Sequence, residues 1–313
     1  MNKRVICLMG PTATGKTEMA MRIADSIPAQ IISVDSAMIY KNMDLGTAKP
    51  DKETLKHYPH KLIDICEPTE RYSTAEFRRD ATAAIEESFN AGKTPILVGG
   101  TFLYFQSLLE GISPIPSVSD EVLATLNQRL AHEGSRALHV ELLKVDPESG
   151  ARLNPNDSQR VLRALSVFHE TGKTLTHFWS LPKQSGLAYP FIKIALANNN
   201  EKKRNAQIAH RYQKMIQSGL VEEVFALRQN YPELNLDYPA MRAVGYRQIW
   251  NYLEDETTLE EAIELAIIAT RQYAKRQRTW LRRESDLVIF DVEAPQYPDN
   301  VLACIHQFLT QEG

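Results

Sequence analysis

The sequence predicts an α/β protein with a three-layer core around a parallel sheet and an all-helical insertion. Short apolar runs alternate along the chain with stretches of helical periodicity, which is typical of buried parallel strands and the helices that cover them. The apolar runs lie at residues 5–9, 31–34, 62–65, 96–98, 191–197 and 287–290. The clearest helix spans residues 74–90 and ends before Gly92, a residue type common just beyond helix ends.

Two segments of turn-forming composition enclose the insertion. Residues 112–117 read Ile-Ser-Pro-Ile-Pro-Ser, and residues 181–186 read Leu-Pro-Lys-Gln-Ser-Gly. Between them, residues 120–172 show helical periodicity and no convincing strand. We therefore predict core segments at 1–112 and 187–313 and a helical insertion at 113–186, and a chain of 313 residues is long enough for both.

Composition narrows the environment and the partners. The net charge of −3 excludes a uniformly basic surface, so any polyanion must bind a local basic patch. The three cysteines, Cys7, Cys66 and Cys304, are scattered without a CxxC pair, which predicts neither disulfides nor a zinc site. The scattered cysteines indicate a reducing cytoplasm, and because the chain has no long apolar segment and no cleavage site we expect neither secretion nor a membrane segment. No coiled coil or long apolar helix requires a dimer, so we expect a monomer.

The most informative motif follows the first apolar run. It is the phosphate-binding sequence Gly10, Pro11, Thr12, Ala13, Thr14, Gly15, Lys16, Thr17. Its glycines let backbone N–H groups point inward, and the helix that begins near Lys16 directs its positive end at the same point. Lys16 adds a full charge, and the Thr17 hydroxyl suits Mg²⁺. The motif predicts a P-loop NTPase-like core that binds a diphosphate or a triphosphate such as ATP, which we favour over a turn that binds nothing.

The phosphate loop leaves the reaction open, because kinases, GTPases, motor ATPases and some transferases share it. Polar residues after other strands are the next candidates, since ligands of parallel sheets bind beyond the carboxyl ends of the strands. Asp35 and Ser36 follow the second apolar run, and Thr101 follows the fourth. Asp35 could hold magnesium or accept a proton from a nucleophile, and a turn or cap role is an equal alternative. Thr101 could merely cap the helix at 102–109, and Asp64, placed in mid-strand, is a weak candidate.

A basic helix is expected near the end of the core. Its cations recur at steps of four, three and four residues and therefore share one face: Arg271, Lys275, Arg278 and Arg282. A neighbouring face is expected to pack inward, formed by Ile263, Ile267, Ala274 and Leu281. A solvated basic face is the ordinary interpretation. The interleaved Tyr273 and Trp280 favour RNA instead, since phosphates attract cations and unstacked bases stack on aromatic rings.

Two further basic patches point to the same partner. One surrounds a helix of the insertion that Asp157 is expected to cap, and it consists of Arg152, Arg160 and Arg163. The other, residues 241–247, reads Met-Arg-Ala-Val-Gly-Tyr-Arg and pairs arginines with a glycine and an aromatic residue. These local patches in a mildly acidic chain predict RNA held between the core and the insertion.

Several sequence blocks together resemble the tRNA dimethylallyltransferases, the isopentenyl-diphosphate:tRNA transferase family. They are the phosphate loop (10–17), IISVDSAMIY (31–40), GTAKP (46–50), HKLIDICEP (60–68), YSTAEFRRDA (72–81), VGGTFLY (98–104), NDSQRVLRAL (156–165), AMRAVGYRQ (240–248) and ATRQYAKRQRTWLRR (269–283). The blocks run in order to about Arg283, and together they are far more specific than a phosphate loop. The chain looks like the short bacterial form, because no counterpart of a C-terminal zinc finger follows Arg283.

The resemblance implies transfer of a dimethylallyl group from dimethylallyl diphosphate to N6 of the adenosine at tRNA position 37, in tRNAs that read codons beginning with uridine. It implies that the phosphate loop and Arg211 hold the diphosphate, with Lys16 and Mg²⁺ near Thr17 stabilising the leaving group. Asp35 would be the general base, and Thr101 would lie near the bridging oxygen of the bond that breaks. The adenine would be flipped into a channel to reach them.

The resemblance also implies which residues contact tRNA. These are Asp35, Ser36, Ala37, Met38, Thr101, Leu123, Gln159, Arg160, Val161, Leu162, Arg163, Ala240, Met241, Arg242, Ala243, Val244, Gly245, Tyr273, Ala274, Lys275, Arg276, Gln277, Arg278, Thr279 and Trp280. Two residues depart from the family pattern. Met38 stands where many relatives have glutamine, and Gln207 replaces a frequent arginine.

Two other classes of protein remain as alternatives. A P-loop small-molecule kinase would share the loop, the sheet and the acid after the second strand. It usually adds an arginine-bearing lid, and it does not need a distal basic and aromatic helix. An RNA-binding module that merely anchors a nucleotide is disfavoured, because Asp35 and Thr101 are expected on one edge of the sheet.

Overall fold

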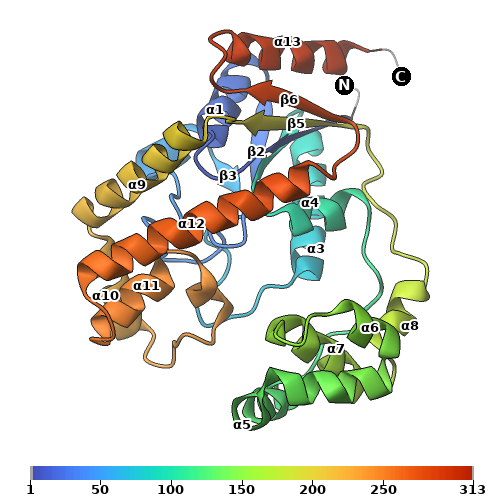
Figure 1. The fold of residues 1–313 in the computed structure, drawn as a ribbon. Helices are drawn as coiled ribbons and strands as arrows, with labels where there is room; N and C mark the ends of the chain where they lie inside the picture. Colours follow the sequence, from blue (N-terminus) through green and yellow to red (C-terminus); the bar gives the residue numbers. More distant parts are fainter. Residues whose placement is uncertain (1–2, 312–313) are drawn as a thin grey trace. The chain divides into compact units, whose positions relative to one another are not determined.

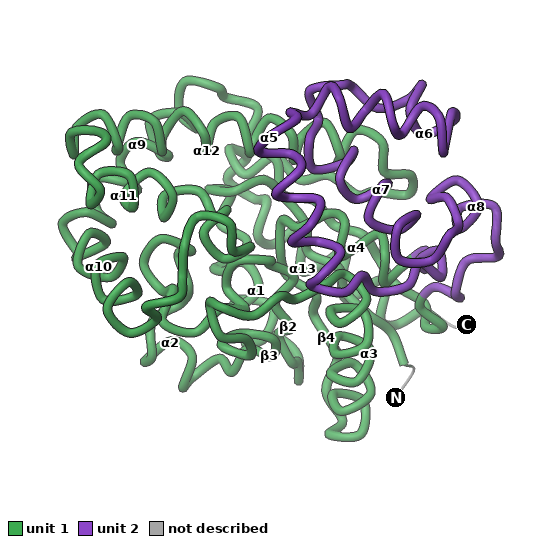
Figure 2. The backbone as a smooth tube through the Cα atoms, turned by 90° about the horizontal axis from the view of Figure 1, so that it is seen from below, with its two compact units in different colours: residues 1–109, 187–313 green, residues 110–186 purple. Residues whose placement is uncertain are grey.

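The computed structural model describes residues 3–311, which form two compact units (Figure 2). Unit 1 contains the described residues up to Leu109 and from Leu187 onwards, and unit 2 is Glu110–Gly186. None of the described helices combines the length and the apolar character that a membrane span requires.

Unit 1 is built on a six-stranded sheet in the order β3-β2-β4-β1-β5-β6, with every neighbouring pair parallel (Figure 1). The strands are β1 Val5–Met9, β2 Ala29–Val34, β3 His60–Lys61, β4 Thr94–Gly99, β5 Phe191–Ala197 and β6 Leu287–Asp291. This confirms the predicted α/β class. Because β2, β4 and β1 are neighbours, the residues that follow them emerge along one edge of the sheet.

Helices cover both faces of this sheet. On one face, α1 (Lys16–Ser26) and α13 (Tyr297–Thr310) bury Ile23 and Val301 against the strands. On the other, α3 (Thr74–Asn90) and α4 (Phe102–Leu109) bury Phe77 and Phe105. The amphipathic spacing of apolar residues along each helix produces these buried stripes. The α3 helix has the bounds expected from the sequence, and a capping box between Ser73 and Glu76 fixes its start.

A second, helical layer of unit 1 lies beside the carboxyl edge of the sheet. Its apolar cluster includes the fully buried Tyr246 and Met241, and Tyr40 packs into it from the segment after β2. Its elements are α9 Glu201–Gln217, α10 Leu220–Asn230, the 3₁₀ turn η1 Pro239–Arg242, α11 Tyr246–Leu253 and α12 Leu259–Leu281, while the short α2 spans Lys52–His57. The basic helix expected from the sequence is therefore α12.

Two strand predictions were wrong in part. Residues 62–65 are not a strand, because β3 ends at Lys61 and the chain then turns through Leu62 and Asp64, whose φ angles are 62° and 55°. The turn lets the amide of Ile65 donate to the carbonyl of Ile39, so this segment pairs with the chain after β2 and does not extend the sheet. The strand at 287–290 forms as β6, but it is an edge strand, and Ile289 is 61% exposed.

All the regular elements of unit 2 are helices, in keeping with the periodicity of its sequence. Its helices are α5 Asp120–Val145, α6 Pro147–Arg152, α7 Ser158–Thr171 and α8 Leu175–Ser180. Asp157 caps α7, as predicted, by accepting from the amide of Arg160. The helix α5 is interrupted at Gly134, whose φ of 80° lies in the left-handed region. A core formed by α5, α7 and α8, with Leu138 and Leu165 fully buried, makes the unit compact.

Candidate active site

The phosphate loop lies between β1 and α1, as the motif predicts. Ala13 and Gly15 have left-handed φ angles of 63° and 74°, which turn the loop so that α1 begins at Lys16. The carbonyl of Pro11 closes the loop by accepting from Thr14 Oγ1 at 2.9 Å and from Lys16 Nζ at 2.7 Å. The loop thus holds a folded shape before a ligand arrives, with the positive end of α1 directed at its centre.

Lys16 is partly exposed as a residue, but its ammonium group lies deep among protein atoms. This burial lowers the pKa of Lys16 to about 8, while the charge of Asp35 acts to raise it and that of Arg211 lowers it further. A buried cation without a full counter-charge is stabilised by an anion, so the electrostatics of the site favour a phosphate. The charges of Asp35 and Arg211 both act on the pKa of Lys16, so the three side chains lie close together.

Arg211 reaches the loop from α9. Its Nη1 donates to Thr12 Oγ1 at 2.9 Å, and its Nε is buried without a hydrogen-bond partner among residues 3–311. Buried polar groups normally find partners, so an unpaired guanidinium nitrogen beside a phosphate loop suits a ligand oxygen. Sequence reasoning placed Arg211 here only through the family resemblance, because nothing in its local sequence singles it out.

These groups line one cavity of about 470 Å³, within the range of small-molecule sites. The phosphate loop from Thr12 to Thr17, Asp35 and Arg211 line it, together with Tyr273 from α12. Burial, and next the charge of Asp35, raise the pKa of Tyr273 to about 12, which keeps its hydroxyl protonated. The cavity therefore combines a cationic phosphate site with a carboxylate and an aromatic ring.

Asp35 lies at the carboxyl end of β2 and is half-buried. Its Oδ1 accepts from the amides of Ala37 and Met38 at 2.8 and 3.2 Å, which fixes the side chain in an Asx-type turn. Its second oxygen, Oδ2, accepts no hydrogen bond within the described part of the chain. One oxygen thus orients the carboxylate while the other is available to a ligand, so the turn role and the chemical role considered from the sequence are compatible.

Thr101 lies next to this turn and not on the cavity wall. Its Oγ1 accepts from the amide of Ser36 at 3.1 Å, and its neighbour Gly100 lines the cavity. In this structure Thr101 therefore ties the carboxyl ends of β2 and β4 together. Its contact with the bridging oxygen stays a prediction that rests on the resemblance.

Thr17 lines the cavity beside Lys16, where the motif predicts a magnesium ligand. No cluster of three or more His, Cys, Asp or Glu side chains that could hold a metal occurs in residues 3–311. Mg²⁺ at phosphate sites typically keeps several waters and binds one or two protein ligands together with the phosphates. The Thr17 hydroxyl beside the phosphate loop fits that kind of ion, whose other ligands would be waters and phosphate oxygens.

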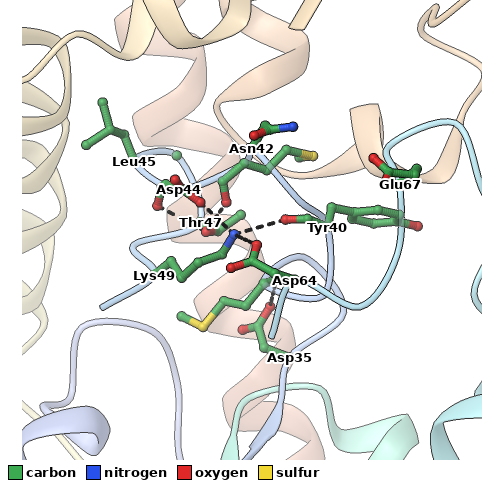
Figure 3. A network of polar contacts seen from close by, with 12 residues as sticks. Asp35, Tyr40, Asn42, Asp44, Leu45, Thr47, Lys49, Asp64 and Glu67 are labelled. Carbon is green, nitrogen blue, oxygen red and sulfur yellow. Dashed lines mark hydrogen bonds and ion pairs between the residues drawn. The ribbon is translucent and has the colours of Figure 1, made fainter. Parts of the chain in front are cut away.

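A buried lysine that sequence reasoning did not single out supports the Asp35 segment. Lys49 Nζ contacts the carbonyl of Tyr40 at 2.9 Å and the carboxylates of Asp44 and Asp64 at 2.6 and 2.5 Å (Figure 3). Its side chain is only 2% exposed, and three acceptors match the three donors of an ammonium group. Lys49 thus joins the chain after β2, the 44–49 turn and the 62–66 turn, and it explains why Asp64 sits outside a strand.

The 44–49 turn is held from its other side by α10 and α11. The Glu223 carboxylate accepts from the amides of Asp44 and Leu45 at 3.1 and 2.8 Å, and from the hydroxyl of Tyr246 at 2.6 Å. The Tyr246 ring packs so closely on Gly46 that a Cβ there would lie 2.4 Å from a ring carbon. These contacts fix the wall of the cavity formed by Gly46 and the two residues after it, a wall that the GTAKP block alone did not reveal.

Replacing Lys49 by methionine is expected to lower the free energy of unfolding by about 2 kcal/mol, because charged hydrogen bonds are lost and two carboxylates are left facing each other. Urea denaturation measures the change. Lys52→Met, at an exposed position in α2 without such contacts, serves as the matched control. Equal stability of the two variants would show that Lys49 does not hold these turns together.

The residues predicted to contact tRNA range from exposed through half-buried to buried. On α12, Lys275 and Arg276 are exposed, and on unit 2 the exposed residues are Gln159, Arg160 and Arg163. Other predicted contacts are buried in this structure: Val161, Leu162, Ala240, Met241, Ala274 and Gln277. They fall inside contiguous ranges whose helical periodicity turns some residues inward, and the tRNA contacts of the whole set stay a prediction.

The inward face of α12 also differs from the expectation. Ile263 and Ile267 are only half-buried, and the buried line runs one position earlier, through Ala262 and Ala266, before it continues to Ala274 and Leu281 as expected. Small residues are on this line because α12 packs closely against α9 and α11. The basic face expected from the sequence adjoins this buried line, with Arg271, Lys275 and Arg282 exposed and Arg278 half-buried.

The basic patch at residues 241–247 reaches the cavity, because Arg242, Ala243 and Val244 line its wall. Burial, followed by the like charges of Arg247 and Arg71, lowers the pKa of Arg242. Cations held close together in this way are stabilised by an anionic partner. The sequence signal for this patch, arginines beside a glycine and a tyrosine, therefore located a real concentration of positive charge.

Comparison with known proteins decides the family. The IPP transferase family matches residues 38–284, which is most of the chain. The chain is also 44% identical to tRNA dimethylallyltransferase 2 of Hahella chejuensis, over 97% of this chain and 95% of that protein. This chain belongs to the IPP transferase family. The curated relative extends the likeness to the phosphate loop and Asp35, which precede the matched family region.

Solved structures agree with this IPP transferase assignment. The tRNA isopentenylpyrophosphate transferase of Bacillus halodurans is 33% identical, with a TM-score of 0.69 and coverage of 98% of this chain and 96% of that one. The corresponding Staphylococcus epidermidis enzyme is 31% identical, with a TM-score of 0.69 and coverage of 97% and 99%. A eukaryotic dimethylallyltransferase described as acting on tRNA shares the fold, with a TM-score of 0.83, 23% identity and coverage of 100% and 81%.

Proposed function

We propose that this protein transfers a dimethylallyl group from dimethylallyl diphosphate to N6 of the adenosine at position 37 of tRNAs that read codons beginning with uridine. Family membership supports the transferase class. The observation that carries the proposal is that the Asp35 carboxylate and the cationic phosphate loop line the same cavity. An electrophile held by the loop and a nucleophile deprotonated by Asp35 can therefore meet in one site.

The donor half of the reaction uses the loop cations. The bond between the allylic carbon and the bridging oxygen breaks, and its electron pair leaves with the diphosphate. Lys16, Arg211 and the inward N–H groups of the loop stabilise the charge that develops on the leaving group. Mg²⁺ beside Thr17 would supply further charge neutralisation when bound.

The acceptor half needs a base, because the lone pair of an adenine amino group is delocalised into the ring and attacks poorly. The new bond forms between N6 and the allylic carbon, and Asp35 Oδ2 accepts the N6 proton. Oδ1 keeps the carboxylate oriented through the amides of Ala37 and Met38. This division of roles gives a positioned general base, the arrangement that efficient proton transfer requires.

The acceptor base must leave its stack to reach this cavity. Tyr273, beside Asp35, offers a ring for an extruded purine, and Arg242 and Arg276 on the cavity wall offer charge to the adjacent phosphates. With tRNA as acceptor, the reaction belongs in the cytoplasm, and a single chain carries all the groups named. We therefore propose that a monomer is active.

The test is transfer of label to RNA. The protein, dimethylallyl diphosphate radiolabelled in its carbon chain, Mg²⁺ and unmodified tRNA carrying A37 are incubated together, and the modified nucleoside is identified by mass spectrometry. We expect label on A37 and none on the same tRNA carrying G37. Absence of label, or transfer of a γ-phosphate from ATP to a small molecule, would overturn the proposal and favour the kinase alternative.

A further inference from the structure

Gln277 of α12 is a buried amide with both ends engaged. Its side chain is 4% exposed although its neighbours on the helix are basic and solvated. Gln277 Oε1 accepts from the amide of Thr12 at 2.9 Å, and Nε2 donates to the carbonyl of Gly100 at 2.9 Å. Since one partner can only donate and the other can only accept, the chemistry fixes the orientation of the amide.

The fit around Gln277 is close. A Cβ built on Gly100 would lie 2.3 Å from Gln277 Nε2, so the glycine leaves the room that the amide occupies. Gln277 therefore does not simply fill space in the core. It joins α12 to the chain after β1 and to the chain after β4, two of the segments that form the phosphate end of the cavity.

Thr12 is consequently held from two helices at once. Its amide is bound by Gln277 of α12, and its hydroxyl accepts from Arg211 Nη1 of α9. The residue before it, Pro11, accepts from Lys16 Nζ, the group that would contact the diphosphate. The position of the loop tip, and with it the resting position of the lysine, depends on the Gln277 contact.

We propose that Gln277 is a positioning residue that holds the phosphate loop in its diphosphate-binding shape by anchoring it to α12. This rests on the proposed function, in which the loop holds dimethylallyl diphosphate. It differs from a role in RNA contact, because the residue is only 4% exposed and both polar ends of its side chain are bonded to backbone groups of Thr12 and Gly100. The helix that carries the exposed cations thus also braces the donor site.

The test is titration of inorganic pyrophosphate into the full-length protein without tRNA. Gln277→Met removes both hydrogen bonds at similar length, and we expect affinity to fall about tenfold, as for loss of buried polar contacts. Gln277→Glu should weaken binding further, since its carboxylate faces the Gly100 carbonyl and adds negative charge beside the diphosphate. In steady-state kinetics the KM for dimethylallyl diphosphate should rise while the KM for tRNA stays unchanged.

Two further variants complete the experiment. Gln272→Glu makes the same chemical change at an exposed position of α12 and should leave pyrophosphate affinity at the wild-type value. Gly100→Ala disturbs the same hydrogen bond from the Gly100 side, because the added methyl group would collide with Gln277 Nε2. It should therefore reproduce the rise in the KM for dimethylallyl diphosphate even if Gln277 variants fold poorly. Pyrophosphate affinity within twofold of wild type in the Gln277 variants, or a rise confined to the KM for tRNA, would overturn the inference. A wild-type protein that binds pyrophosphate but labels no tRNA would overturn the proposed function alone.

Discussion

Replacing Asp35 by asparagine is expected to lower kcat for dimethylallyl transfer by about 10²–10⁴-fold, the contribution typical of a positioned general base. Asparagine keeps the Oδ1 acceptor for the amides of Ala37 and Met38, so the turn after β2 should be preserved. What it loses is the second oxygen as a proton acceptor. Single-turnover measurements with saturating tRNA and dimethylallyl diphosphate isolate this step from binding.

Two comparisons separate a chemical role of Asp35 from a structural one. The affinity of the variant for tRNA should stay close to that of wild type, because the exposed cations of α12 are untouched. Asp299→Asn, on the exposed first turn of α13, makes the same change away from the cavity and should not alter kcat. Turnover by Asp35→Asn at the wild-type rate would remove Asp35 from the base role.

Replacing Lys16 by methionine is expected to lower kcat/KM for dimethylallyl diphosphate by about 10²–10³-fold, as loss of one preorganised charge-stabilising donor does. The lysine charge acts both on the bound diphosphate and on the charge that develops as it leaves, so both KM and kcat should change. Affinity for tRNA measured without dimethylallyl diphosphate should be unaffected. Wild-type kcat/KM in this variant would contradict the assignment of the loop to the diphosphate.

The pH dependence of the wild-type enzyme provides a second measurement of Lys16. Burial lowers the pKa of Lys16 to about 8, and only the protonated form carries the charge that attracts the diphosphate. Because kcat/KM reports groups of the free enzyme, it should be constant just below pH 8 and fall as the pH rises above it. Lys16→Met should lack this fall, and a fall of equal size in that variant would assign it to another group.

The parts of the fold that the sequence predicted are those encoded locally. The phosphate loop carries its glycines, lysine and flanking strand within a few residues, so its conformation and the start of α1 follow from the motif. Asp35 was found because a polar residue directly after a buried strand must lie at the binding edge of a parallel sheet. The helix α3 has the expected bounds, and α7 begins directly after Asp157, the expected cap.

The parts that the sequence did not predict depend on contacts between distant segments. The apolar residues at 62–65 read as a strand, and only pairing with the chain after β2 makes them a turn. In the sequence Lys49 looks like a surface lysine. In the folded chain its side chain is buried, and its ammonium group is paired with the carboxylates of Asp44 and Asp64. Gln277 lies in a basic stretch that predicts RNA contact, and its true environment is set by the phosphate loop, more than 260 residues earlier in the chain.

The most direct measurement is a crystal structure of the protein with pyrophosphate and an anticodon stem-loop whose A37 is unmodified. We expect pyrophosphate on the backbone amides of the phosphate loop, in contact with Lys16 and Arg211. The extruded adenine should place N6 about 3 Å from Asp35 Oδ2, the reach of a general base. An adenine that stays stacked in the RNA loop, or a carboxylate turned away from the cavity, would contradict the proposed reaction.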